Sequence, residues 1–413
     1  MRIRLLLLCL AGLIVVAGWR QVTRSNRLRP QPNPLTAWRS AAEDLERRLA
    51  LTPGDAATRS ELARVYFVHE EFARCLEHLN TLCIQQPGNA QIHARLALTQ
   101  RSLGQMVAAL ASARRVVKLQ PNHAEAWQLQ GELLAAQGLD DAAIAAFDRA
   151  LVLNSASYEA LLGKARSLET LYGEQRPVST AAILRPVERA VALQPERTDG
   201  LNTLARMLFT LTGEVARATT LARKSLRLNP ESAYPHLILA EIMLASPTAG
   251  QLTEAAEHAQ AAAERDTRNP EPLYLLGKTR WRQRRVKEAI AALERSLRIR
   301  SLPQTVYLLS LAYQRDGQPD RARRFAEVYR RWNGFLEQRK VLQAALRHRP
   351  RDLELHCRFA ELYLSTGDVA PAENWLRKAE LLAPKSPRVR QLWRGLEEQK
   401  RNPPPHPFAV DDL

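Results

Sequence analysis

The stretch AWQLQGELLAAQGLDDAAIAAFDRALVLNS, from Ala126 to Ser155, decides the fold of this chain. It is rich in alanine and leucine, which are strong helix formers, and it contains no proline. Gly138 stands near its middle, where it permits a turn between two helices. The stretch therefore predicts a helical hairpin, which belongs either to a catalytic helical domain or to a repeated unit.

The prolines of the chain indicate a repeat. Pro53, Pro87 and Pro121 are each 34 residues apart, and Pro350 and Pro384 are again 34 apart. Between them Pro195, Pro230 and Pro270 follow at intervals of 35 and 40, and Ser155 and Ser301 stand where further members of the series are expected. Proline cannot continue a helix, so each one closes a helical stretch. Internal periodicity of this length is typical of stacked helical repeats.

Other positions recur when the chain is aligned on these prolines, and they have mechanical roles. Small residues such as Gly131 and Ala143 let two antiparallel helices approach closely, while Trp127 and Phe147 fill the gaps between them. Ala150 also recurs, and the last copy supplies matching residues at Phe359, Ala360, Tyr363, Gly367 and Ala372.

This pattern resembles the tetratricopeptide repeat, a 34-residue helix–turn–helix unit. The resemblance implies an all-α fold, a right-handed superhelical solenoid of about 8–9 repeats over residues 55–384. Two insertions, near residues 173–180 and 246–253, are expected in loops, and they could divide the array into subdomains near Gln175 and Ala249.

The segments that flank the repeats have their own expected roles. Residues 37–54 are expected to form a half-repeat capping helix, and residues 385–400 a second capping helix. Residues 20–36 are basic and contain prolines, so they predict a flexible linker. Residues 401–413 contain three consecutive prolines and predict a disordered tail.

Residues 1–19 predict a signal-anchor or a signal peptide. Arg2 and Arg4 precede fifteen residues without a charge, Leu5 to Trp19. These would span about 22 Å as a helix, against a hydrocarbon core of about 30 Å. An uncleaved anchor would leave a single-pass protein with a periplasmic or extracytoplasmic solenoid. Cleavage would give a secreted or periplasmic protein.

No catalytic or cofactor-binding motif appears in the sequence. The phosphate-binding loop, the dinucleotide fingerprint, the nucleophile elbow and the zinc-protease helix motif are all missing. The nine histidines and four cysteines have no metal-ligand spacing. The sequence thus predicts a protein that is not an enzyme and needs no metal or cofactor.

The charge of the chain is concentrated. The formal net charge is +17, and residues 278–350 hold nineteen lysines or arginines against six acids. The basic patch predicted in this block comprises Arg280, Arg284, Arg285, Lys287, Arg321, Arg323, Arg324, Arg330 and Arg331. It is a solvated helix face, a docking surface for an acidic protein or peptide, or a site for anionic lipid or nucleic acid. A nucleic-acid role fits badly with an exported or tethered chain.

The resemblance also implies where a partner binds. In tetratricopeptide proteins the first helix of each repeat lines a concave groove. The corresponding residues here are Asn202, Arg206, Phe209, Tyr234, Tyr274, Lys278, Trp281, Arg282, Tyr307 and Arg315. Aromatic and arginine side chains are frequent anchors of peptide binding. We therefore expect a non-enzymatic scaffold that binds proteins or peptides.

An alternative role remains open. Bacterial proteins with this layout also serve as regulatory or substrate-recruiting subunits of envelope enzymes or export complexes, for polysaccharide, secretion or cytochrome maturation. The sequence does not choose between these roles and a general scaffold.

Overall fold

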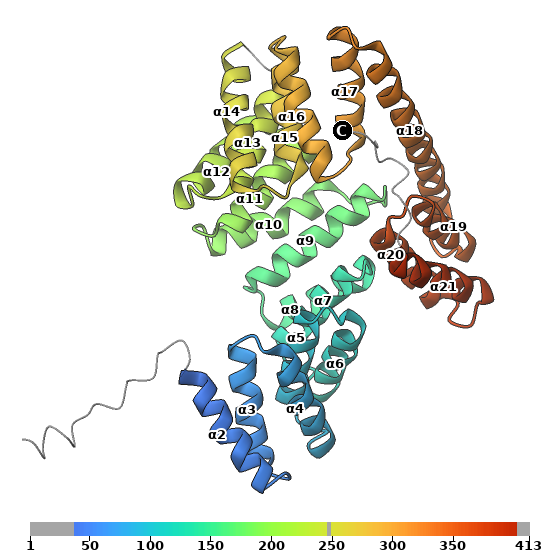
Figure 1. Cartoon of the computed structure of the whole chain (residues 1–413). Helices are drawn as coiled ribbons and strands as arrows, with labels where there is room; N and C mark the ends of the chain where they lie inside the picture. The colour runs from blue at the N-terminus through green and yellow to red at the C-terminus, as the bar shows by residue number, and fades with distance from the viewer. Residues whose placement is uncertain (1–36, 246–248, 403–413) are drawn as a thin grey trace, which may run out of the picture. The chain divides into compact units, whose positions relative to one another are not determined.

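A computed structural model describes residues 37–245 and 249–402. Within these ranges the chain forms twenty α-helices and no strand, so the predicted all-α fold of tandem helical hairpins is confirmed (Figure 1). The chain divides into two compact units, Met1–Gly104 and Gln105–Leu413. The predicted signal segment, linker and disordered tail fall outside the described residues, apart from Arg401 and Asn402.

The described part of the first unit, from residue 37 onward, contains four helices: α2 (Ala37–Leu51), α3 (Ala56–Val68), α4 (Phe72–Gln85) and α5 (Ala90–Ser102). The Asp55 carboxylate caps α3 by accepting hydrogen bonds from the backbone N–H groups of Ala57 and Thr58. The core is formed by apolar side chains from all four helices, among them Ala42, Leu62, Tyr66, Leu79 and Leu96.

The second unit contains sixteen α-helices within residues 105–245 and 249–402. Their bounds are α6 (Met106–Leu119), α7 (Ala124–Ala136), α8 (Asp140–Leu153), α9 (Tyr158–Gly173), α10 (Thr180–Leu193), α11 (Thr198–Met207), α12 (Val215–Leu228), α13 (Ala233–Ala245), α14 (Ala249–Arg265), α15 (Pro270–Arg282), α16 (Val286–Ile299), α17 (Pro303–Arg315), α18 (Pro319–His348), α19 (Leu353–Leu364), α20 (Val369–Leu382) and α21 (Pro387–Arg401). From α7 to α20, successive helices pair as hairpins, and α21 follows the last pair.

The hairpin of the deciding stretch consists of α7 and α8, and it owes its close packing to glycine. The Phe147 side chain on α8 is 1% exposed. A Cβ atom added to Gly131 on α7 would lie 2.7 Å from the Phe147 ring, and one added to Gly163 on α9 would lie 2.4 Å from it. Gly138 turns the chain with a φ of +68°. Phe147 therefore occupies space that two glycines leave open.

The prolines at the hairpin ends provide more than helix termination. The Trp127 indole N–H donates to the Pro121 carbonyl at 2.8 Å. His93, in the first unit, pairs its Nε2 with the Pro87 carbonyl at 3.1 Å. The aromatic residue at the start of the hairpin thus fixes the entry of the chain into the helix. Pro350 and Pro384 follow the ends of α18 and α20.

The expected division into subdomains near Gln175 and Ala249 is wrong. One continuous core runs from Tyr158 on α9 to Ala292 on α16, past both insertions. The boundary between the compact units falls instead at Gly104. The first insertion lengthens α9 and the loop before α10, and α14 begins at Ala249. Both insertions lie at the turn of a hairpin, α9–α10 and α13–α14, and residues 249–253, expected in a loop, belong to α14. Extra residues at a hairpin turn leave the apolar faces of the helices free to stack.

Two helices depart from the regular repeat. Helix α18 runs for 30 residues, because no proline stands between Pro319 and Pro350. Its first half packs in one cluster through Phe325 and Trp332, and Leu346 near its end belongs to another cluster. Helix α11 continues into a π-helical turn, η1 (Leu208–Thr212), which ends at Gly213.

None of the helices in the described ranges is both long and apolar enough to cross a membrane. Residues 1–19, which carry the prediction of a signal-anchor or signal peptide, are not among those described.

Candidate partner-binding surface

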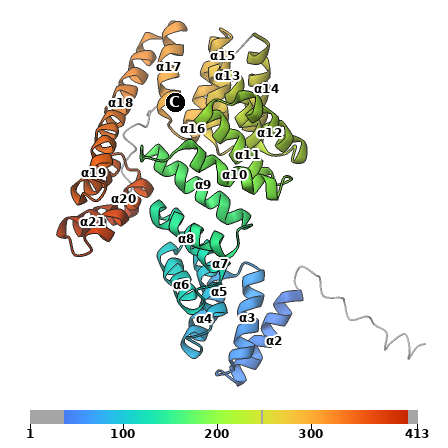
Figure 2. The same ribbon diagram turned by 180° about the vertical axis from the view of Figure 1, so that it is seen from behind.

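The ten predicted groove residues lie on the first helices of four consecutive hairpins, α11 with η1, α13, α15 and α17. Successive first helices are in contact, α11 with α13, α13 with α15, and α15 with α17. Figures 1 and 2 show these helices in this order from opposite sides. We call the ten residues the first-helix surface.

A ladder of alternating charge runs through this surface. Arg206, Glu241 and Lys278 are each the ninth residue of their helix, on α11, α13 and α15. The Arg206 guanidinium binds the Glu169 carboxylate of α9 through two hydrogen bonds of 2.7 Å. Those hydrogen bonds raise the pKa of Arg206. Arg206 is therefore held in place by the preceding hairpin.

Glu241 was missed by the sequence analysis, although the ninth-residue register could have found it. Burial, followed by the charge of Glu271, raises the pKa of Glu241 to about 7. The positive charges of Arg206 and Lys278 act in the opposite direction. Burial also lowers the pKa of Lys278, with a smaller contribution from Arg282. The middle of the surface thus carries a carboxyl group that titrates near neutral pH.

Two tyrosines of the first-helix surface present their rings to solvent. Tyr234 is 40% exposed and Tyr307 is 45% exposed. The Tyr307 ring lies 4.8 Å from that of Tyr329 on α18. Such rings combine a large apolar area with little conformational freedom, which suits them to anchor a bound peptide.

Arginines stand beside these rings. The Arg315 guanidinium lies over the Trp281 ring at 5.4 Å. The Arg282 guanidinium donates a hydrogen bond to the Leu244 carbonyl of α13 at 2.6 Å, which holds the Arg282 side chain against that helix. Both residues are exposed. They therefore supply positive charge in a fixed place, next to aromatic area.

The remaining members of the surface are partly structural. Asn202 is 5% exposed, and its side-chain oxygen is buried without a hydrogen-bond partner among the described residues. Phe209 lies in the π-helical turn, and both Phe209 and Tyr274 pack against the continuous core. These side chains shape the surface more than they offer area to a ligand.

The basic patch is spread over several elements, from the end of α15 to the middle of α18. Arg280 and Arg285 are paired with Glu288, Arg323 is paired with Asp320, and Arg321 lies over the Tyr313 ring at 5.4 Å. Arg284, Lys287, Arg324, Arg330 and Arg331 are exposed. Trp332 on α18 is 8% exposed and packs in the core, which favours the core role over base stacking.

In the described part of the chain, no cluster of side chains is arranged as a metal site or a catalytic site would be. No three histidine, cysteine, aspartate or glutamate side chains gather as metal ligands would. Cys75, Cys83 and Cys357 are free thiols. Burial raises the pKa of each, so none is activated as a nucleophile.

Models of the tetratricopeptide repeat match three segments of the chain, residues 93–159, 248–303 and 339–393. Together with the tandem hairpins, these matches show that the chain is a tetratricopeptide repeat protein. Proteins of this class generally bind other proteins or peptides, and they are typically not catalytic.

Solved tetratricopeptide structures resemble parts of the chain. A repeat protein from Parabacteroides merdae is 13% identical, covers 62% of this chain and 98% of its own, and has a TM-score of 0.49. PilF of Pseudomonas aeruginosa is 18% identical, with 55% and 96% covered and a TM-score of 0.45. PilW, a type IV pilus biogenesis factor, is 20% identical, with 51% and 92% covered and a TM-score of 0.44. No curated protein sequence matches the chain significantly.

Proposed function

We propose that this chain is a non-enzymatic scaffold that binds partner proteins or peptides on the first-helix surface. The observation that carries the proposal is the exposure of Tyr234 on α13 and Tyr307 on α17, at 40% and 45%, on the two first helices that flank α15. Exposed arginines beside them, Arg282 and Arg315, add positive charge to the same surface. Aromatic and arginine side chains carry most of the binding energy in many interfaces.

The row of Arg206, Glu241 and Lys278 on α11, α13 and α15 supports binding of a specific partner rather than non-specific association. Arg206 is locked to Glu169, and Glu241 lies between Arg206 and Lys278. A partner must match these polar groups in order, which gives specificity more than affinity. The net positive charge of the chain, +17, favours acidic segments as partners.

We further propose that residues 1–19 tether the scaffold to a membrane or direct its export. The support is the uncharged run of Leu5 to Trp19 behind two arginines. Mass measurement of the mature protein, combined with membrane fractionation, distinguishes the two. An intact N-terminus in the membrane fraction indicates an anchor, and a shortened chain in the soluble fraction indicates a cleaved signal.

Site-specific photocrosslinking tests the first-helix surface. A photoreactive phenylalanine analogue is placed at Tyr234 or Tyr307 in the full chain and irradiated in the cells that produce it. We expect a discrete adduct from both positions. The matched control is Val152, a 74% exposed residue on the second helix α8.

The adduct should also depend on the neighbouring side chains. With the analogue at Tyr307, Tyr234→Ala and Arg315→Glu should each reduce its yield several-fold, since each removes contact area or charge from the same surface. Equal adducts at Val152, or yields that neither substitution changes, would contradict the proposal.

A further inference from the structure

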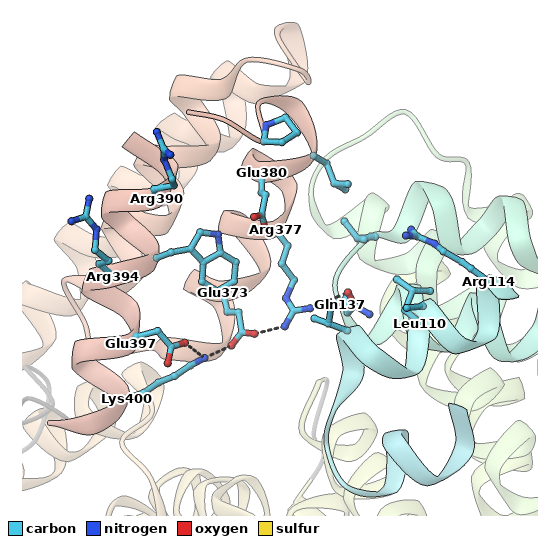
Figure 3. Close-up of a pocket in the computed structure, with 16 residues that line it drawn as sticks. Leu110, Arg114, Gln137, Glu373, Arg377, Glu380, Arg390, Arg394, Glu397 and Lys400 are labelled. Carbon is cyan, nitrogen blue, oxygen red and sulfur yellow. Dashed lines mark hydrogen bonds and ion pairs between the residues drawn. The ribbon is translucent and has the colours of Figure 1, made fainter. Parts of the chain in front are cut away.

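A second groove lies within the second unit, far from the first-helix surface along the chain. It runs between α6 on one side and α20 with α21 on the other, and it has a volume of about 1050 Å³ (Figure 3). Small-molecule sites have volumes of about 300–1000 Å³, so this groove is at the upper limit for a small ligand. We call it the end groove and define it by Val107, Leu110, Arg114, Leu381, Arg390 and Arg394.

Contacts across the start of the groove hold its two sides together. Arg377 on α20 donates to the side-chain oxygen of Gln137 at 2.9 Å, although 240 residues separate them. A Cβ atom on Gly138 would lie 3.1 Å from the Asn374 side chain, also on α20. Figure 3 shows Arg377 extending to Gln137, with Leu110 and Arg114 beyond it on the other side.

Both sides of the end groove expose apolar side chains to solvent. Val107 on α6 and Leu381 on α20 are each 63% exposed. Leu110, Leu139 and Trp393 line the groove between them. Large exposed apolar side chains gathered in one concave place mark interaction sites more often than scattered ones do.

The acids and bases that line the groove are unequally paired. Glu373 is bound by Arg377 and by Lys400, and Lys400 also binds Glu397. In contrast, the guanidinium groups of Arg114, Arg390 and Arg394 have no ion pair within the described residues, and these residues are exposed. Of the three acids that line the groove, Glu380 alone has no ion pair with a described residue. The charge that remains available to a ligand is therefore positive.

We propose that the end groove binds an acidic peptide segment of a partner protein, with a large apolar side chain seated between Val107 and Leu381. The arginines lie on both sides of the apolar floor, and Arg390 and Arg394 are one helical turn apart on α21. Each can hold a carboxylate through two hydrogen bonds. Acidic residues flanking one apolar anchor match this arrangement, whereas a purely charged polymer would leave the floor uncovered.

This site goes beyond the proposed function and does not depend on it. It is formed by α6, α20 and α21, and it shares no residue with the first-helix surface. A scaffold with both sites would hold two different segments at once, and each would be lost separately on mutation.

Selection of displayed peptides tests the proposal. Random peptides of about twelve residues are selected on the purified full chain, and the enriched peptides are labelled for fluorescence anisotropy. We expect enrichment of sequences with two or more aspartates or glutamates around one leucine, phenylalanine or tryptophan. Reversal of Arg390 and Arg394 to glutamate should weaken their binding by at least about 10-fold.

The matched control reverses Arg185 and Arg189 on α10, which are also exposed and spaced by four residues. Their reversal should leave the affinity within about 2-fold, because the total charge change is the same while the groove is intact. Leu381→Ser should weaken binding without any change in charge. Thermal melting by circular dichroism confirms that each variant is folded.

Three results would overturn the proposal. The selection could enrich no acidic peptides, the enriched peptides could bind equally well after Arg390→Glu/Arg394→Glu, or the α10 control could weaken them as much. Peptides that lose binding with Tyr234→Ala/Tyr307→Ala and keep it with the α21 variant would occupy the first-helix surface. That outcome would refute the end groove and support the proposed function.

Discussion

Lys378 and Glu174 are separated by 204 residues in the chain, and the Lys378 ammonium lies 2.9 Å from the Glu174 carboxylate. Each side chain is 19% exposed. Lys378 also lies over the Trp375 ring at 4.5 Å, and its charge acts on the buried carboxyl of Asp140. The Lys378 ammonium on α20 thus interacts with two acidic residues, Glu174 and Asp140, which belong to the hairpins formed by α7 to α10.

Removal of this ammonium should loosen α20. Lys378→Met leaves Glu174 without its partner in a place that is mostly shielded from water, at a cost of about 2 kcal/mol. We expect faster amide hydrogen exchange in α20 and in the turn between α7 and α8. Lys164→Met, at a more exposed pair with Asp148, is the control and should cost less than about 1 kcal/mol. Unchanged exchange in α20 would show that apolar packing alone holds this contact.

An alanine at position 163 should destabilise the second unit. Its Cβ would lie 2.4 Å from the Phe147 ring, which is 1% exposed and has no free space. We expect a net loss of about 1–3 kcal/mol in the free energy of unfolding, despite the better helix propensity of alanine. Chemical denaturation measures the loss.

Gly173 at the end of the same helix is the control, since a Cβ there meets nothing within 4 Å. Phe147→Leu in the Gly163→Ala background should recover part of the loss, because the two sites share one space. Strictly additive losses would argue against the contact.

Glu241 should make the stability of the second unit depend on pH. Its pKa is raised from 4.5 to about 7, chiefly by burial. The neutral form is therefore favoured in the folded state, and its contribution is present below pH 4.5 and lost as the pH rises through 7. Glu241→Gln should raise the free energy of unfolding by about 1–2 kcal/mol at pH 8 and change it little at pH 4.5.

Denaturation at the two pH values measures this effect. Glu257→Gln is the control, because Glu257 is exposed on α14. A Glu241→Gln benefit that is equal at both pH values would mean that the carboxyl does not titrate in this range.

His236 and His258 should produce the opposite dependence. Their Nδ1 atoms are 2.7 Å apart, so one ring donates an N–H hydrogen bond to the unprotonated Nδ1 of the other. Burial lowers the pKa of both residues, which favours their neutral forms. Burial, followed by the charges of His258 and Arg265, lowers the pKa of His236 to about 4. The stability that depends on the neutral form is present above pH 6.5 and is lost as the pH falls through 4.

His236→Gln keeps a hydrogen-bonding group and removes the titration. We expect the fall in the free energy of unfolding between pH 6.5 and 4 to shrink by about 1–2 kcal/mol. His123→Gln, at an exposed pair with Glu125, is the control for the loss of a surface imidazole. If the free energy of unfolding of His236→Gln falls as steeply between pH 6.5 and 4 as that of the unchanged protein, other groups cause the fall.

Much of the hairpin pattern could be read from single residues. The proline spacing places most helix ends, and Gly131, Phe147 and Gly138 lie where a hairpin needs a small, a large and a turning residue. The 30-residue α18 did not follow from that spacing, because the interval from Ser301 to Pro350 holds more residues than one repeat. The candidate surface was placed on its helices by register, while Glu241 at the same register was overlooked.

The sequence by itself determined the repeated hairpin, since close approach of two neighbouring helices depends on residues within about 34 positions of one another. Only the tertiary structure decided which sites the array creates. The pairing of Lys378 with Glu174, the contact of Arg377 with Gln137 and the pKa of Glu241 join residues from different hairpins. Such contacts follow from small rotations accumulated between successive repeats, and no local pattern in the chain records that sum.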